Sequence, residues 1–262
     1  MTRDTPPTQP TGSEGTAFNS ACYVYGIVPA DVCLDRLDGL DGMGNGIVLV
    51  ADGPVAALVE AIDPDRPLGR RRHLVTHTTV LNEVAECHPV LPMRFGSVLD
   101  SRSSVVAELL RPRLEHFESL LQRVAGKHQF NVRARYVLDR VLAEVVASGS
   151  EVRGRREQTR ERPEDATHHQ RIRLGERSAR AVEARRVRDG REILERLSAH
   201  VHGYVVKDVS GMDSIAEFSF AVTDDERARF EAEAQALAQD MDGLARICLV
   251  GPMALYDFVP ED

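Results

Sequence analysis

His73 and His77 are the residues whose type and spacing come nearest to a chemical site. They stand four apart in a segment with helical periodicity, so they would share one helix face and could hold a metal ion together. The residues between them are Leu-Val-Thr, and no acidic residue or third ligand follows at a suitable spacing. His77 also falls within the apolar stripe of that helix, which favours a packed, hydrogen-bonded histidine. We therefore expect no metal, no cofactor and no catalytic residue in this chain.

Other patterns that could carry chemistry are incomplete. His200 and His202 alternate on a predicted strand without partners, and the sequence contains no GxSxG, P-loop or GxGxxG motif. Phe218 and Phe220 share one face of a predicted strand, as base-stacking aromatic residues do in RNA-recognition modules. The basic and glycine-rich context of those modules is missing, so we expect both phenylalanines to lie in the core or in an interface.

The segment Val90-Leu-Pro-Met-Arg-Phe-Gly-Ser-Val-Leu99 is the most distinctive in the chain. Pro92 would interrupt a strand ladder, and Gly96 permits an unusual backbone angle or a close approach. Arg94 is a charge within an apolar run, which predicts a carboxylate or backbone carbonyls as its partners. Strand alternation would place Arg94 on one face with Pro92 and Gly96, and Leu91, Met93 and Phe95 on the other.

In the first half of the chain, strand and helix patterns alternate. We predict strands over 22–28, 47–51, 55–62 and, interrupted, 90–99, with a hairpin turn at Asp52-Gly53-Pro54. A helix is predicted over 68–87 and ends before Pro89; the residues on its apolar face are Leu74, Thr78, Leu81 and Ala85. Residues 101–126 are predicted to form two helices divided near Pro112.

The second half repeats this order around a charged segment. We predict a strand over 130–136, a helix over 138–147, strands over 201–209, 215–222 and 246–250, and a helix opened by a Thr223–Glu226 capping box. Residues 151–197 contain 14 Arg against 10 Asp and Glu. Because Gly175 and Gly190 fall within this segment, we expect an interrupted, charged helix, with disorder around 162–170.

These patterns predict an α+β fold of two ferredoxin-like domains in βαββαβ order, the second with an enlarged Arg-rich helical crossover. The first domain fits if residues 31–40 make a short crossover. The predicted organisation is a disordered tail over 1–20, one domain over 21–126, a second over 127–250 with a helical insertion over 138–198, and a C-terminal tail over 251–262.

Composition narrows the classes of function. The 262 residues carry a formal net charge of −8, and aromatic residues make up only 5% with no Trp. An acidic chain poor in aromatics disfavours nucleic acid and anionic membranes as partners. No apolar run approaches the roughly 18 residues of a membrane helix, and the four cysteines form no CxxC pair. We therefore expect a cytoplasmic protein.

Three motifs resemble those of one family. Leu91-Pro-Met-Arg-Phe-Gly96 resembles the hallmark of the gas vesicle protein family GvpF/GvpL, and Tyr23-Val-Tyr-Gly-Ile-Val28 resembles its first strand. The closing Gly251-Pro-Met-Ala-Leu-Tyr-Asp-Phe-Val259 also fits, although family members usually have a Trp-Pro-Pro-Tyr stretch after Gly-Pro. The resemblance runs from about residue 21 to the C-terminus, and the motifs leave the choice between the F and L paralogues open.

The resemblance implies a non-enzymatic accessory protein for gas vesicle assembly. Such an adaptor would bind the small hydrophobic shell-forming subunit and other accessory gas vesicle proteins, in the cytoplasm and at the gas vesicle. The family-motif and interaction candidates are Tyr23, Tyr25, Gly26, His77, Leu91, Pro92, Met93, Arg94, Phe95, Gly96, Gly251, Pro252, Tyr256 and Phe258. Two alternatives are a metal- or small-molecule-binding enzyme on duplicated ferredoxin-like domains, using His73 and His77, and RNA binding through the second domain.

Overall fold

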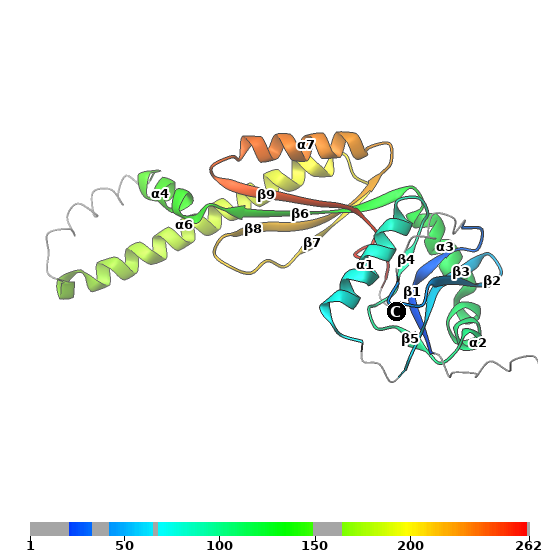
Figure 1. The fold of residues 1–262 in the computed structure, drawn as a ribbon. Helices are drawn as coiled ribbons and strands as arrows, with labels where there is room; N and C mark the ends of the chain where they lie inside the picture. Colours follow the sequence, from blue (N-terminus) through cyan, green and yellow to red (C-terminus); the bar gives the residue numbers. More distant parts are fainter. Residues whose placement is uncertain (1–20, 33–41, 65–67, 149–163, 261–262) are drawn as a thin grey trace, which may run out of the picture.

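A computed structural model describes residues 21–32, 42–64, 68–148 and 164–260. The fold is a mixed α/β arrangement of two antiparallel sheets, each forming a lobe with its own helices (Figure 1). The predicted tail over 1–20 and most of the predicted 31–40 crossover lie outside the described residues. Within the described ranges, no helix is both long and apolar enough to cross a membrane.

The sheet of the first lobe is built around strand β1 (Ala21–Pro29). Its order is β2-β3-β1-β4, and β5 also pairs with β1; the other strands are β2 (Ile47–Asp52), β3 (Val55–Ile62), β4 (Leu91–Pro92) and β5 (Val98–Leu99). The predicted hairpin between β2 and β3 is confirmed. Residues 21–28 are all buried, because helices cover both faces of this central strand.

Helix α1 (Arg71–Ala85) covers one face of this sheet. The predicted apolar face is confirmed in part: Leu81 and Ala85 are buried, and so is the packed His77, whereas Leu74 is 49% exposed and His73 is buried beside them. Hydrogen bonding offsets the cost of burying an imidazole, so histidine can take the inward position.

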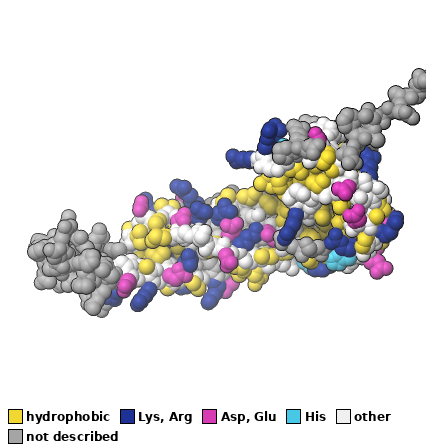
Figure 2. All heavy atoms as spheres, turned by 90° about the horizontal axis from the view of Figure 1, so that it is seen from below, with side chains coloured by type: hydrophobic (Ala, Val, Ile, Leu, Met, Phe, Trp, Pro, Cys, Tyr) yellow, Lys and Arg dark blue, Asp and Glu magenta, His cyan; other side chains and the backbone are white. Residues whose placement is uncertain are grey.

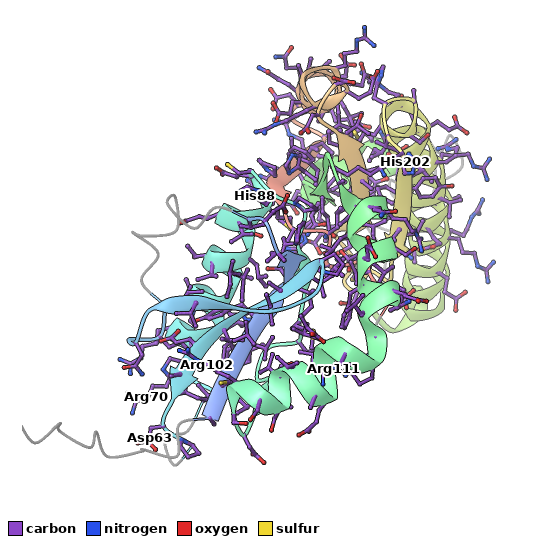
Figure 3. The ribbon with its side chains drawn as sticks, turned by 90° about the vertical axis from the view of Figure 1, so that its right-hand side faces the viewer. Asp63, Arg70, His88, Arg102, Arg111 and His202 are labelled. Carbon is purple, nitrogen blue, oxygen red and sulfur yellow. The ribbon has the colours of Figure 1, made fainter. Side chains whose placement is uncertain are left out.

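The opposite face of the first sheet is covered by one irregular helical stretch. It comprises α2 (Arg102–Ser104), a π-helical turn (Val105–Leu110), a 3-10 turn (Arg111–Arg113) and α3 (Leu114–Val124). The 3-10 turn contains Pro112, where the sequence predicted a division. Arg111, labelled in Figure 3, donates to Asp52 at the end of β2 over 3.3 Å, so this stretch is also tied to the sheet edge.

The second lobe contains a four-stranded sheet in the order β7-β8-β6-β9. Its strands are β6 (Lys127–Tyr136), β7 (Gly203–Lys207), β8 (Ser214–Thr223) and β9 (Ala245–Met253). Helices α4 (Leu138–Ser148), α6 (Glu164–Ser198) and α7 (Arg227–Asp240) accompany it (Figure 1). The core lies between one face of the sheet and the helices: Phe218 and Phe220 pack there with Ile193 of α6 and Phe230 of α7.

Helix α6 runs for 35 residues without a break, so the predicted interruptions at Gly175 and Gly190 are wrong. Glycine costs a helix interior only about 1 kcal/mol, which tertiary packing can outweigh. Ile193 and Leu197 are fully buried and anchor the end of α6. Gly190 also lies close to β8, since an added Cβ would come within 3.7 Å of the Ala216 Cβ.

Two further local predictions in the second lobe are wrong. Thr223 belongs to β8, and Glu226 precedes α7 without any side-chain cap, so the capping box does not form. Thr223 is the last residue of a paired strand, where its carbonyl accepts from the Glu226 N–H instead. His200 and His202 lie before β7, which begins at Gly203, so they do not alternate on a strand (His202, Figure 3).

Candidate functional site

The first lobe contains a buried polar cluster built from the motif residues of strand β1. Tyr23 and Tyr25 stand two apart on β1 and therefore both point toward α1. His77 comes from α1, and its ring stacks on Tyr25 with centroids 5.6 Å apart and planes at 19°. Phe95 completes the group with a perpendicular contact to His77 at 5.7 Å.

His77 uses both ring nitrogens in hydrogen bonds. Nε2 lies 3.1 Å from the Met93 carbonyl oxygen, which can only accept, so Nε2 carries the proton. Nδ1 then accepts from the Tyr23 hydroxyl over 2.8 Å, and that hydroxyl in turn accepts from the Gly96 N–H at 3.3 Å. Burial lowers the pKa of His77 and raises the pKa of Tyr23 to about 12, so both side chains stay neutral near pH 7.

Tyr25 makes the second polar connection, to a fully buried carboxylate. Its hydroxyl donates to Glu60 of β3 over 2.6 Å. The carboxylate also accepts from the backbone N–H groups of Met43 and Asn45, at 2.6 and 2.8 Å. Burial, followed by the hydrogen bond to Glu60, raises the pKa of Tyr25. An added Cβ at Gly42 would overlap this carboxylate, so the loop backbone fits closely around it.

This cluster fastens the hallmark segment to the central strand. Met93 N–H donates to the Tyr25 carbonyl at 2.9 Å, and the Met93 carbonyl binds His77. Gly26 pairs with Pro92, and a Cβ on Gly26 would lie only 2.8 Å from the Leu91 oxygen. The close approach of β1 and β4 therefore requires glycine at position 26. The cluster brings together eight candidates, namely Tyr23, Tyr25, Gly26, His77, Leu91, Pro92, Met93 and Phe95.

Arg94 and Gly96 form a turn at the surface. The Ser97 N–H donates to the Arg94 carbonyl at 3.1 Å, and Gly96 has a φ of +92°, as the third residue of a type II turn requires. Residues 94–96 thus turn away from the sheet between β4 and β5, so the predicted strand alternation is wrong there. The Arg94 side chain is exposed.

The remaining candidates lie where the two lobes meet. Strand β9 continues past Gly251 and Pro252 into a segment that packs on the first lobe. Leu255 is 3% exposed and belongs to the same core as α3, and Tyr256 and Phe258 pack against the first-lobe cores.

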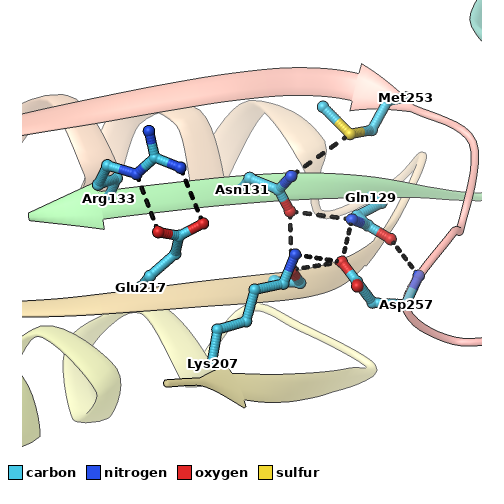
Figure 4. Close-up of polar contacts among 8 residues, drawn as sticks. Gln129, Asn131, Arg133, Lys207, Glu217, Met253 and Asp257 are labelled. Atoms are coloured by element: carbon cyan, nitrogen blue, oxygen red, sulfur yellow. Dashed lines mark hydrogen bonds and ion pairs between the residues drawn. The ribbon is translucent and has the colours of Figure 1, made fainter. Parts of the chain in front are cut away.

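Asp257 is the polar centre of this seam, and sequence reasoning did not identify it. Its carboxylate accepts from Gln129, from Ser219 at 2.7 Å and from Lys207 at 2.8 Å, while its N–H donates to the Gln129 side chain at 2.9 Å (Figure 4). Burial raises the pKa of Asp257, but the hydrogen bonds from Lys207 and Ser219 outweigh it and hold the pKa below 3.8. The group therefore stays charged and ties three strands of the second lobe to the segment on the first.

The contacts of His77 and the burial of Phe218 and Phe220 test the two alternative functions, metal binding and RNA binding. Since both nitrogens of His77 are engaged, this residue offers no lone pair to a metal. Among the residues that the structure describes, no three His, Cys, Asp or Glu side chains gather where they could hold a metal ion. Phe218 and Phe220 are 4% and 0% exposed, so neither presents a ring for base stacking, and their predicted core position is confirmed.

Comparison with known proteins gives one consistent result. The family model described as "Gas vesicle synthesis protein GvpL/GvpF" matches residues 21–260. The chain is 33% identical over 240 residues to Gas vesicle protein F of a Streptomyces species, covering 90% of this chain and 98% of that protein.

Two crystal structures share the fold. GvpF from an Anabaena species superposes with a TM-score of 0.80 at 21% identity, covering 93% of this chain and 99% of that one. GvpF from Microcystis aeruginosa gives a TM-score of 0.72 at 21% identity, covering 91% and 98%.

Proposed function

Because the chain belongs to the GvpL/GvpF family of gas vesicle synthesis proteins, as its motifs indicated, we propose that it is a non-enzymatic adaptor in gas vesicle assembly. In this proposal it binds the small hydrophobic shell-forming subunit and other accessory gas vesicle proteins, in the cytoplasm and at the vesicle. A subunit with an apolar, gas-facing surface would aggregate in water unless another protein covered it. The adaptor must therefore offer a surface that accepts apolar chain.

Exposed hydrophobic side chains at one edge of the second sheet carry this proposal. Tyr204 and Val206 of β7 are 49% and 60% exposed, and Met212 in the following loop is 72% exposed. We call these three residues the β7 patch. On the side of the molecule viewed in Figure 2, hydrophobic side chains lie exposed among charged ones along this lobe. Such a patch on an acidic chain is a candidate protein-binding surface.

The backbone at this edge is suited to strand addition. Strand β7 pairs with β8 on one side, and no other described strand pairs with its opposite side. An extended segment of the shell subunit could add there, with main-chain hydrogen bonds along β7 and its apolar side chains over Tyr204 and Val206. The net charge of −8 on the adaptor would keep such a complex dispersed.

Co-expression with the shell-forming gas vesicle protein tests the proposal. We expect the shell protein to co-purify in soluble form with the wild-type chain and to be lost with Val206→Asp. The matched control is Val187→Asp, since Val187 is an exposed valine, 53% accessible, that lies on helix α6 and not on the β7 edge. Equal recovery with all three chains, or equal loss with both variants, would reject the β7 patch as the binding surface.

Arg94 is a second proposed contact. Among the sequence candidates other than glycine, it is the one with an exposed side chain, and it lies in a surface turn of the first lobe. We expect Arg94→Glu to reduce vesicle formation while the thermal melt is unchanged. An unchanged vesicle yield would leave the hallmark segment with only an architectural role.

We also propose that both lobes are variants of the ferredoxin-like arrangement. In the second lobe, the described elements follow one another as β6, α4 with α6, β7, β8, α7 and β9, and the sheet order is β7-β8-β6-β9. The first sheet has the corresponding order, β2-β3-β1-β4. An experimental structure that resolves residues 33–41 would test whether a crossover helix completes the first lobe.

A further inference from the structure

The face of the second sheet opposite the helices is largely uncovered. Along β6, Phe130, Val132 and Ala134 point into the helix-covered core, so Arg133 and Arg135 project from the other face. Near the seam, the Asp257 network covers this face. Farther along, a groove of about 430 Å³ opens, lined by Arg133, Arg135, Asp213, Arg246 and Cys248.

Two arginines of this groove stand directly opposite each other. Arg135 of β6 and Arg246 of β9 are register partners in the antiparallel ladder. Directly opposed side chains have Cβ atoms roughly 5 Å apart, and like charges in such positions destabilise the sheet. This pairing breaks a local rule of sheet design, and sequences tend to break such rules at functional sites.

The carboxylates around the groove do not neutralise all three arginines. Arg133 makes a bidentate ion pair with Glu217, with two N–H···O distances of 2.9 and 3.0 Å (Figure 4). The hydrogen bond from Arg133 is the main cause of the lowered pKa of Glu217. Arg135 reaches Asp213 only at 3.5 Å. Arg246 is exposed and makes no ion pair with any described residue. Three guanidinium groups thus face two carboxylates, which leaves a positive charge in an acidic chain.

A β-bulge lies at the same place. Pairing between β6 and β8 passes from Ala134–Ala216 directly to Arg135–Ser214, so one residue of β8 is skipped. Bulges redirect side chains and are common beside functional sites. Here the bulge falls at Arg135, between the Arg133–Glu217 pair and the loop that carries Asp213.

We propose that this groove, the arginine groove of Arg133, Arg135 and Arg246, binds an extended acidic segment of a partner protein. Strand β9 is the edge strand beside the groove, so a segment running along it would turn alternate side chains toward this face, and a carboxylate at the level of Arg246 would also reach Arg135, which lies beside it across the ladder. Carboxylates there form charge-assisted hydrogen bonds and relieve the arginine repulsion. The chain as a whole has a net charge of −8, so overall charge does not attract an acidic peptide and binding depends on local cationic groups. This surface is separate from the β7 patch, which lies at the opposite sheet edge.

The test uses the full-length protein and two fluorescein-labelled decapeptides, one of alternating Glu and Thr and one of alternating Gln and Thr. Fluorescence anisotropy should show the Glu peptide binding about tenfold or more tightly than the Gln peptide, and the difference should shrink as salt is raised. Bound Glu peptide should also slow alkylation of Cys248, which is exposed in the groove, while the exposed Cys87 of the first lobe reacts unchanged. Equal binding of both peptides, or unchanged alkylation of Cys248, overturns the proposal.

Arg246→Glu is the decisive variant, and Arg123→Glu is its control. Arg123 is an exposed arginine of α3 in the first lobe, so both variants change the net charge equally. Arg246→Glu should weaken Glu-peptide binding about tenfold or more, and its Tm should hold or rise because the introduced carboxylate faces Arg135. Arg123→Glu should bind as the wild type does. Equal weakening in both variants means general charge attraction and contradicts a defined groove.

Discussion

Tyr25 donates a hydrogen bond of 2.6 Å to Glu60, a carboxylate with no exposed surface. The bond joins the central strand to its neighbour from the inside of the first lobe. Two backbone N–H groups complete the environment of the carboxylate, so protein donors replace the water that it loses on folding.

Tyr25→Phe should lower the free energy of unfolding by about 1–3 kcal/mol, because it removes a donor from a buried charge-bearing group. Tyr256→Phe is the matched control. The Tyr256 hydroxyl is buried without a hydrogen-bond partner, so its removal should be neutral or slightly stabilising. Urea denaturation of both variants measures the difference, and equal destabilisation would contradict the role assigned to Glu60.

Stability should fall as the pH is lowered past about 6.5, and His77 should account for part of the loss. Burial lowers the pKa of folded His77 from 6.5, so the unfolded chain takes up a proton first. The unfolded state then binds more protons, and the free energy of unfolding decreases with falling pH. His77→Gln should be less stable near neutral pH but should show a shallower decrease. Identical pH slopes in the two proteins would refute this.

Gly251→Ala should destabilise the protein strongly, by roughly 2 kcal/mol or more. Gly251 has a φ of +153°, and an added Cβ would lie 2.6 Å from the Phe130 ring and 2.8 Å from the Gln129 oxygen. Gly175 of α6 has no atom within 4 Å of such a Cβ, so Gly175→Ala should stabilise by about 0.5–1 kcal/mol. Thermal melts should show opposite signs, and a shared sign would be inconsistent with this packing.

Leu255→Ala should destabilise the first lobe, although Leu255 follows the last strand of the second. The side chain is 3% exposed in the core that contains Phe117 and Leu121, so its truncation should cost about 2–5 kcal/mol. Hydrogen exchange should accelerate in α3 of the first lobe. Faster exchange confined to the second lobe would argue against this.

Because Leu255 belongs to the core of the first lobe, deleting residues 251–262 would disturb the fold along with any binding surface.

Element patterns in the sequence were sufficient to predict most strands. The hairpin of β2 and β3 and the strands β6 and β8 follow from local periodicity alone. On α1, the buried positions of Leu81, Ala85 and the packed His77 were predicted, but the exposure of Leu74 and the burial of His73 were not, because tertiary contacts set the exact rotation of the helix.

The polar centres were harder to foresee. Glu60 carried a usable signal, as a single carboxylate in the otherwise apolar strand β3, which predicts a buried and hydrogen-bonded acid. No local pattern in the sequence indicated that Asp257 would be a polar centre. Its partners Gln129, Lys207 and Ser219 lie on three different strands, and only the folded topology brings them together.

The position of Leu255 also bears on how the protein is made. A ribosome completes the first lobe's strands and helices long before it reaches the segment that fills their core, and domains otherwise tend to fold in order of synthesis. The nascent first lobe must therefore wait with an unfilled apolar site until the whole second lobe has emerged. Residues 254–259 thus complete the core of the first lobe only after the second lobe has been synthesised. Stable folding of the first lobe therefore depends on synthesis of the second.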